Sequence, residues 1–240
     1  MKPVLKHRWD LGVAEARNLQ ERLARRVIVR GRPPAEPLLV CGCDAAGAGR
    51  WSRGDETILA AAVVISVPGF ELVDSAWVEG PSPFPYVPGL LSFREAPLYV
   101  QALRRLKVDP DVIVCDGQGL AHPRLFGLAC HIGVLFGKPC VGAAKSRLIG
   151  EYDEPGRERG SSTPLRLQGR VVGRVVRTRT GVRPLFVSPG HRLGIEEAAS
   201  LVLRLATRYR LPEPTRLADR WIRSIRRGET VPPRPMPPAV

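Results

Sequence analysis

The stretch Asp111-Val-Ile-Val-Cys-Asp-Gly-Gln-Gly-Leu-Ala-His-Pro-Arg124 decides the fold. Residues 111–115 are apolar at nearly every position, which predicts a strand buried on both faces in the middle of a sheet. The run ends at Asp116, followed by Gly117 and Gly119, where the backbone can turn sharply and approach a ligand. Ligands of α/β sheets bind at the carboxyl ends of strands, so Asp116 is a candidate site residue. An Asp-Gly pair also begins many ordinary turns, so other acidic residues must decide.

Further strands and helices are predicted on both sides of this strand. The runs at 38–44, 57–67 and 70–79 are joined by short turns and predict an antiparallel meander. Another strand follows at 140–144, and a strand pair at 171–176 and 184–187. Helical spacing of apolar residues marks 10–27, with Asp10 as its N-cap, then 93–107, 125–136, 194–208 and an Arg-rich helix after 211–219.

The order of these elements predicts an RNase H-like α/β fold. Three antiparallel strands are followed by helix, strand, helix, strand and helix, which gives a mixed central sheet continued by parallel strands and flanked by helices. Residues 1–228 are expected to form a single domain, with residues 151–162 as an exposed loop. Residues 229–240 are expected to form a proline-rich tail.

The composition favours a polyanionic partner. The 240 residues include 37 Lys and Arg but only 23 Asp and Glu, so the formal net charge is +14, and nucleic acid is the first expectation. There is no long apolar span, lipidation signal or secretory leader, so we expect a cytoplasmic location without membrane contact. Five cysteines, four of them in strand-like runs, indicate buried thiols more than a zinc site.

Four acidic residues are predicted to meet at one edge of the sheet. Asp44 ends the first strand and Asp116 ends the fourth, while Glu95 lies in the first turn of a helix and Asp219 opens the last one. Hard oxygen ligands of this kind suit Mg²⁺ or Mn²⁺ and metal-assisted hydrolysis of a phosphodiester. Taken singly, Glu95 could be a solvated charge at a helix start and Asp219 could pair with a neighbouring arginine.

A lysine and a stiff loop complete the candidate residues. Lys145 follows the strand at 141–144, where an ammonium group could hold a phosphate or could simply be exposed. Residues 80–89 are too rich in proline for a helix or an inner strand and predict a stiff loop whose tip is Pro85-Tyr86-Val87-Pro88.

Five segments resemble motifs of the endonuclease V family, the deoxyinosine 3′-endonucleases. They follow the family's order and are Tyr86-Val-Pro-Gly-Leu-Leu-Ser-Phe-Arg-Glu95, Asp116–Arg124, Val141-Gly-Ala-Ala-Lys-Ser-Arg147, Pro184–Arg192 and Tyr209–Asp219. The resemblance implies hydrolysis of the second phosphodiester bond 3′ to a deaminated base, leaving 3′-hydroxyl and 5′-phosphate ends.

The resemblance also implies roles for the candidate residues. Asp44 and Asp116 would bind Mg²⁺, for which Mn²⁺ could substitute, Glu95 and Asp219 would complete the acidic cluster, and Lys145 would lie near the phosphate. The tip Pro85-Tyr86-Val87-Pro88 would fill the gap left by an extruded base. Gly117, Gly119 and His122 would read the base, and His122 could support the metal shell or be a simple turn histidine.

This sequence departs from the family pattern in small ways. Gln118 replaces a frequent histidine, residues 45–49 are unusually small, and the proline-rich tail is extra. We expect a monomer that binds DNA containing deaminated bases and needs no protein partner. The alternatives are another RNase H-like nuclease, such as a junction resolvase or an inosine-RNA endonuclease, and a noncatalytic basic nucleic-acid-binding protein.

Overall fold

A single mixed sheet of eight strands organises the chain. The structure is a computed structural model that describes residues 1–47 and 57–236, so the expectations for residues 48–49 and 237–240 lie outside it. Its strands are β1 (Leu38–Gly47), β2 (Thr57–Val67), β3 (Leu72–Pro81), β4 (Val112–Cys115), β5 (Cys140–Ala144), β6 (Ser162–Leu167), β7 (Arg170–Val176) and β8 (Leu185–His191). Its helices are α1 (Val13–Ala24), α2 (Leu91–Arg105), α3 (Leu128–Phe136), α4 (Ile195–Leu205) and α5 (Glu213–Ile225).

The strand order confirms the predicted RNase H-like α/β architecture. The order across the sheet is β3-β2-β1-β4-β5-β8-β7-β6. Strands β1, β2 and β3 form the antiparallel meander, and β4 and β5 continue from β1 in parallel. Strand β8 runs antiparallel to β5, and β7 and β6 extend the sheet as a hairpin.

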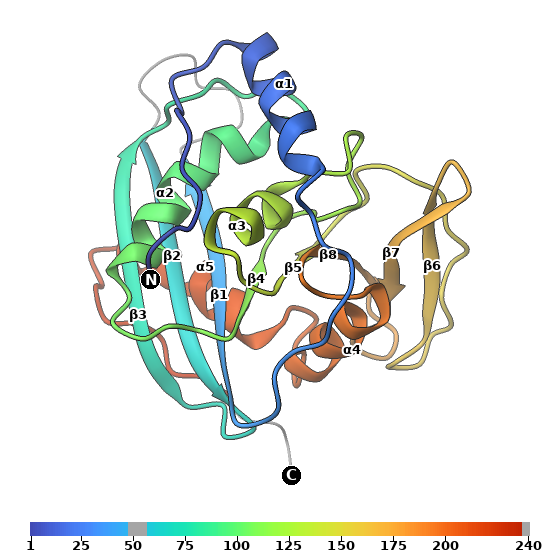
Figure 1. Cartoon of the computed structure of the whole chain (residues 1–240). Helices are drawn as coiled ribbons and strands as arrows, with labels where there is room; N and C mark the ends of the chain where they lie inside the picture. The colour runs from blue at the N-terminus through green and yellow to red at the C-terminus, as the bar shows by residue number, and fades with distance from the viewer. Residues whose placement is uncertain (48–56, 237–240) are drawn as a thin grey trace.

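Helices cover both faces of this sheet (Figure 1). Helices α2 and α3 pack on one face, where they contact Cys41 and Cys43 of β1. Helices α4 and α5 pack on the other face, which receives Val40 of β1 and Val114 of β4. Alternate residues of a strand point to opposite faces, so the composition of β1 and β4 supplies apolar side chains to both layers.

The starts of α1, α2 and α5 differ from the sequence expectations in ways that move a capping or candidate residue. Helix α1 begins after Gly12, because the carboxylate of Asp10 is paired with Arg8 and caps no helix. Helix α2 begins at Leu91, so Pro97 lies inside the helix and not in its first turn. Helix α5 begins at Glu213, so Asp219 lies in its second turn and not at its start.

The segment expected to be an exposed loop is partly sheet. Residues 151–162 run into β6, and Glu151 forms a bridge with Arg166. The guanidinium of Arg177, which is buried, orders the preceding part by bonding Glu154 and the carbonyl of Pro155. Strand β6 begins at Ser162, where the charged, glycine-rich run ends, and its own six residues have too little apolar alternation to predict a strand.

The start of the expected tail contacts α5. The indole of Trp221 donates to the carbonyl of Thr230 at 3.1 Å, and the amide of Met236 donates to Glu213 at 2.7 Å. The division at residue 228 therefore stays a prediction. Among residues 1–47 and 57–236, no helix has the length and apolar composition needed to cross a lipid bilayer.

Candidate active site

Asp116 and Lys145 directly follow β4 and β5, and Asp44 lies in the adjacent strand β1, which continues to Gly47 and does not end at Asp44 as expected. Cys43 of β1 is the register partner of Cys115 of β4, and the amide of Asp116 donates to the carbonyl of Cys43 at 3.1 Å. Asp44 and Asp116 are the next residues after this pair, and neighbouring strands lie about 5 Å apart. Because Cys43 and Cys115 face α2 and α3, strand alternation turns the next residue of each strand toward the face covered by α5. The carboxylates of Asp44 and Asp116 therefore lie close together.

Helix α5 brings Asp219 to the same edge because Gly42 lets it approach β1. A methyl group on Gly42 would lie closer than 3.0 Å to backbone atoms of Pro214 and Thr215, so the first turn of α5 rests directly on the strand. Asp219 then faces the cavity beside Asp44. Its carboxylate also pairs with Arg223 at 2.8 Å, one turn along the helix.

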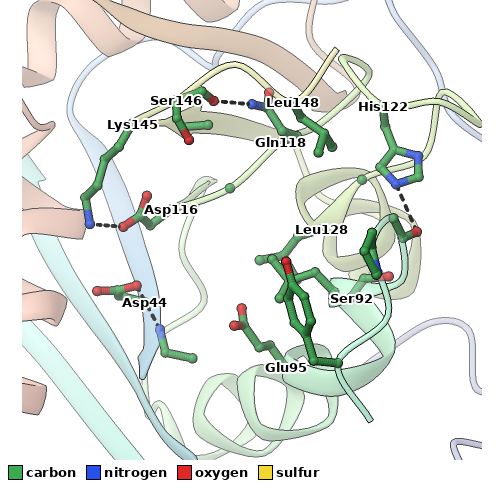
Figure 2. Close-up of a pocket in the computed structure, with 18 of the residues that line it drawn as sticks. Asp44, Ser92, Glu95, Asp116, Gln118, His122, Leu128, Lys145, Ser146 and Leu148 are labelled. Carbon is green, nitrogen blue, oxygen red and sulfur yellow. Dashed lines mark hydrogen bonds and ion pairs between the residues drawn. The ribbon is translucent and has the colours of Figure 1, made fainter. Parts of the chain in front are cut away.

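Glu95 reaches the acidic cluster from the opposite layer of helices. It is the fifth residue of α2, beyond the first turn in which it was expected. Figure 2 shows its carboxylate turned into the cavity on the side where Asp44 lies. All four predicted acidic residues therefore line one cavity, although they are up to 175 positions apart in the chain, from 44 to 219.

The acidic residues are largely buried and repel one another. Burial raises the pKa of Asp44 well above its usual range, and the neighbouring charges of Asp116, Asp219 and Glu95 raise it further. Burial also raises the pKa of Asp116, although Lys145 opposes that change. A cation in the cavity would relieve both effects.

Lys145 is the cation that the structure places there. Its ammonium group donates to the carboxylate of Asp116, as Figure 2 shows. Burial alone would lower the pKa of Lys145, but Asp116 and Asp44 outweigh it and the net change is a rise. Lys145 therefore stays protonated at neutral pH, with 41% of its side chain exposed toward incoming anions.

The donor set fits a hard divalent cation bound jointly with a substrate. Within the residues that the structure describes, no three His, Cys, Asp or Glu side chains are grouped closely enough to hold an ion by themselves. Magnesium is commonly bound through one or two carboxylates together with water and substrate phosphate oxygens. Asp44 and Asp116 supply such a pair, whereas the five buried thiols, expected to be structural, lie free in the core.

The wall of the cavity contains apolar as well as acidic residues. The volume of the cavity is about 510 Å³, and its wall also includes Leu128, Leu148, Gly117 and Gln118. The amide of Gln118 donates to the carbonyl of Ser146 at 2.9 Å, which ties the segment after β5 to the wall (Figure 2). Apolar side chains beside charged groups suit a ligand that is partly apolar and partly anionic.

The proline-rich loop forms the rim of this cavity. Tyr86 is 49% exposed, Pro85 and Pro88 are exposed, and Val87 is half-buried. Tyr86, Val87 and Pro88 line the cavity, and Pro85 lies just outside its wall. A large aromatic side chain held out at a cavity mouth is available to a partner.

Two of the predicted base-reading residues have other contacts. Gly119 does not line the cavity: its amide donates to Ser188 at 2.9 Å, and a methyl group there would strike the backbone of Pro189. His122 does line it, but its Nδ1 accepts from the amide of Arg124 at 3.2 Å and its Nε2 contacts the carbonyl of Gly89 at 3.0 Å.

His122 is therefore a neutral structural bridge between Gly89 and Arg124, and its support of a metal shell stays a prediction. Since Nδ1 accepts a hydrogen bond, Nε2 carries the proton and donates to Gly89. Burial, helped by the charge of Arg124, lowers the pKa of His122 to about 4. Sequence reasoning also missed Gln20, Leu128 and Leu148 as wall residues, because a buried glutamine on α1 and two leucines carry no motif of their own.

Comparisons with known proteins show what the whole chain resembles. The family model described as Endonuclease V matches residues 21–220. An endonuclease V of Roseiflexus castenholzii is 46% identical over 225 residues, covering 91% of this chain and 96% of that protein. The crystal structure of endonuclease V from Streptomyces avermitilis has a TM-score of 0.85 at 43% identity, covering 93% of this chain and 96% of that one. Endonuclease V of Ciona intestinalis, in complex with a 24-mer DNA containing an inosine followed by a ribo-adenosine, has a TM-score of 0.77 at 28% identity, covering 90% and 98%.

Proposed function

The chain belongs to the endonuclease V family and is a deoxyribonuclease, and from that premise we propose that it recognises deoxyinosine and hydrolyses the second phosphodiester bond 3′ to it. The products are 3′-hydroxyl and 5′-phosphate ends, and the damaged base stays in the nicked strand. The observation that carries the proposal is one cavity lined both by Asp44, Asp116 and Lys145 and by Tyr86 and Leu128. The charged residues can contact a scissile phosphate while the other residues contact an extruded base.

The acidic side of the cavity positions the phosphate. We assign Asp44 and Asp116 to binding Mg²⁺, with Mn²⁺ able to replace it, and Glu95 and Asp219 to completing the negative field around it. Such an ion, when bound, activates water and neutralises charge on phosphate oxygens. Lys145 is free to turn from Asp116 toward the phosphate once that carboxylate has another cation to bind.

The other side of the cavity receives the base. The tip Pro85-Tyr86-Val87-Pro88 fills the gap in the duplex, which offsets the few kcal/mol lost in unstacking. Gly117 lines the cavity next to Asp116, so its backbone can read the edge of a base held against Leu128. The Ciona intestinalis relative binds DNA containing inosine, which supports a deaminated base as the group that enters.

A nicking assay tests the proposal directly. A labelled duplex with one inosine should be cut one nucleotide beyond the lesion with Mg²⁺ and left intact with EDTA. Asp44→Asn and Asp116→Asn should abolish cleavage and keep DNA binding, while Asp109→Asn, at an exposed acid paired with Lys138, should cleave normally. A cut at the lesion itself, or full activity in the two site variants, contradicts the assignment.

A strand containing ribose is the second candidate substrate. The Ciona intestinalis complex carries a ribo-adenosine directly after the inosine. The same assay with a ribonucleotide at the position 3′ to the lesion, and with inosine in RNA, separates a deoxyribonuclease from an enzyme that prefers RNA, because only the 2′-hydroxyl differs between the strands. We expect the DNA strand to be cut by this protein. A preference for branched DNA without inosine would instead identify a junction resolvase.

A further inference from the structure

Three side chains converge on one carbonyl at the base of the proline-rich loop. The carbonyl oxygen of Gly89 accepts hydrogen bonds from Gln20 Nε2 at 3.2 Å, His122 Nε2 at 3.0 Å and Arg124 Nη2 at 2.8 Å. Figure 2 shows the His122 bond at the edge of the cavity. A carbonyl oxygen has two lone pairs, so two donors already fulfil its hydrogen-bonding capacity. The third donor indicates that the position of this carbonyl is held firmly.

Gln20 connects this point to helix α1. Its side chain is 1% exposed, and every polar atom of the amide is used. One hydrogen of Nε2 is directed to Gly89 and the other to the carbonyl of Phe126 at 2.8 Å, while Oε1 accepts from Arg124 Nε. Because a guanidinium can only donate, the amide has a single orientation that satisfies all its partners.

The loop is fixed at its other end as well. Phe84 is buried against Phe93, and its carbonyl accepts from Ser82 Oγ at 2.9 Å and Arg94 Nη1 at 3.4 Å. Gly89 has φ of +77°, and a methyl group there would lie 2.9 Å from Arg124 Nη2. The exposed tip of residues 85–88 is thus held between two fixed points.

We propose that Gln20 is a positioning residue that, together with Arg124 and His122, holds the carbonyl of Gly89 so that the loop tip enters the duplex without first being ordered. The inference rests on the proposed function, because it concerns how the same loop extrudes a base. A loop that must be ordered on binding loses free energy at every immobilised side chain, whereas a rigid one does not. Gln20 lines the cavity wall, but its amide bonds to Gly89, Phe126 and Arg124 and not to the acidic cluster, so it acts through the loop.

The test compares the same lesion in a duplex and in a single strand. Extrusion from a duplex needs the wedge, whereas a base in a single strand is already unstacked. Gln20→Glu keeps the acceptor for Arg124 but turns an oxygen toward the Gly89 carbonyl, and Gln20→Leu removes both donors. Asn18→Leu, at an exposed amide of the same helix, is the matched control.

We expect kcat/KM on the inosine duplex to fall about fivefold to tenfold in both Gln20 variants, as the loss of one hydrogen bond to a buried carbonyl gives. Cleavage of the single strand should not change, and Asn18→Leu should resemble the wild type on both substrates. Fluorescence of 2-aminopurine beside the lesion should show less unstacking in Asp44→Asn/Gln20→Glu than in Asp44→Asn alone.

Equal losses on duplex and single strand would overturn the inference, because they would mean a general defect of folding. Unchanged activity on both would overturn it as well. A wild-type protein that cuts inosine in neither substrate would refute the proposed function itself, together with this inference. If the wild type cleaves inosine DNA normally, the proposed function stands, and the results of the Gln20 variants then bear on the positioning role of Gln20 alone.

Discussion

Replacing Gly42 by alanine tests how the cluster of acidic residues is assembled. The new methyl group would lie closer than 3.0 Å to the backbone of Pro214 and Thr215, and backbone cannot rotate away as a side chain can. Overpacking of this kind costs about 1–3 kcal/mol, and we expect the upper part of that range. For a chain of this size each kcal/mol lowers Tm by about 2–4 °C, so 3 kcal/mol corresponds to a fall of roughly 6–12 °C.

Activity should fall more than stability in this variant. Retreat of α5 from β1 moves Asp219 away from Asp44, and a displacement of about 1 Å at a reacting group costs on the order of 100-fold in rate. Thermal melting and single-turnover nicking measure the two effects. Gly69→Ala is the control, since its methyl group would meet Ser66 Oγ at an ordinary 3.4 Å. A Gly42→Ala protein that melts and cleaves like the wild type would show that close packing of α5 does not position Asp219.

Three other changes test the electrostatics of the cavity. Asp44→Asn should raise Tm in EDTA. The pKa of Asp44 is higher in the folded than in the unfolded protein, so its carboxyl group destabilises the fold increasingly as pH rises above the unfolded-state pKa. The same variant should lose cleavage and should show no Tm increase when Mg²⁺ is added. Lys145→Met should lower the single-turnover rate by about 100-fold, and a rate equal to the wild type would remove Lys145 from the reaction. For His122 the folded pKa of about 4 lies below the usual 6.5, so its contribution to stability is complete above pH 6.5 and is lost as pH falls toward 4. The loss is of order 3 kcal/mol, and urea denaturation of the wild type and His122→Asn at both pH values should show it as a difference.

Much of the sheet could be predicted because buried strands are short apolar runs. Strand β2 and strand β5 begin and end where expected, and Asp116 directly follows β4 as expected, whereas β1 continues three residues beyond Asp44. The hidden strand was β6, since Ser162–Leu167 lies at the sheet edge and has few buried side chains. Edge strands need little apolar alternation, so composition does not reveal them.

The helix starts were less predictable for reasons that lie in tertiary structure. Pro97 sits inside α2, where the missing amide costs free energy that packing of Leu98, Tyr99 and their neighbours against the sheet offsets. The role of His122 was hidden as well, because its partner Gly89 is 33 positions away. Pairings between distant residues follow from the assembled fold and not from local pattern.

The hydrolytic centre and the loop tip are built on independent parts of the chain. Asp44 lies in β1 and Asp116 directly follows β4, whereas residues 85–88 lie in a loop whose flanking carbonyls, those of Phe84 and Gly89, accept hydrogen bonds from Arg94 and Arg124. Exchanging those four residues therefore leaves the strands undisturbed. Related enzymes can therefore diverge in which damaged nucleotide they accept through substitutions in residues 85–88, while the acidic residues stay unchanged. Directed evolution of lesion specificity can target the same four residues.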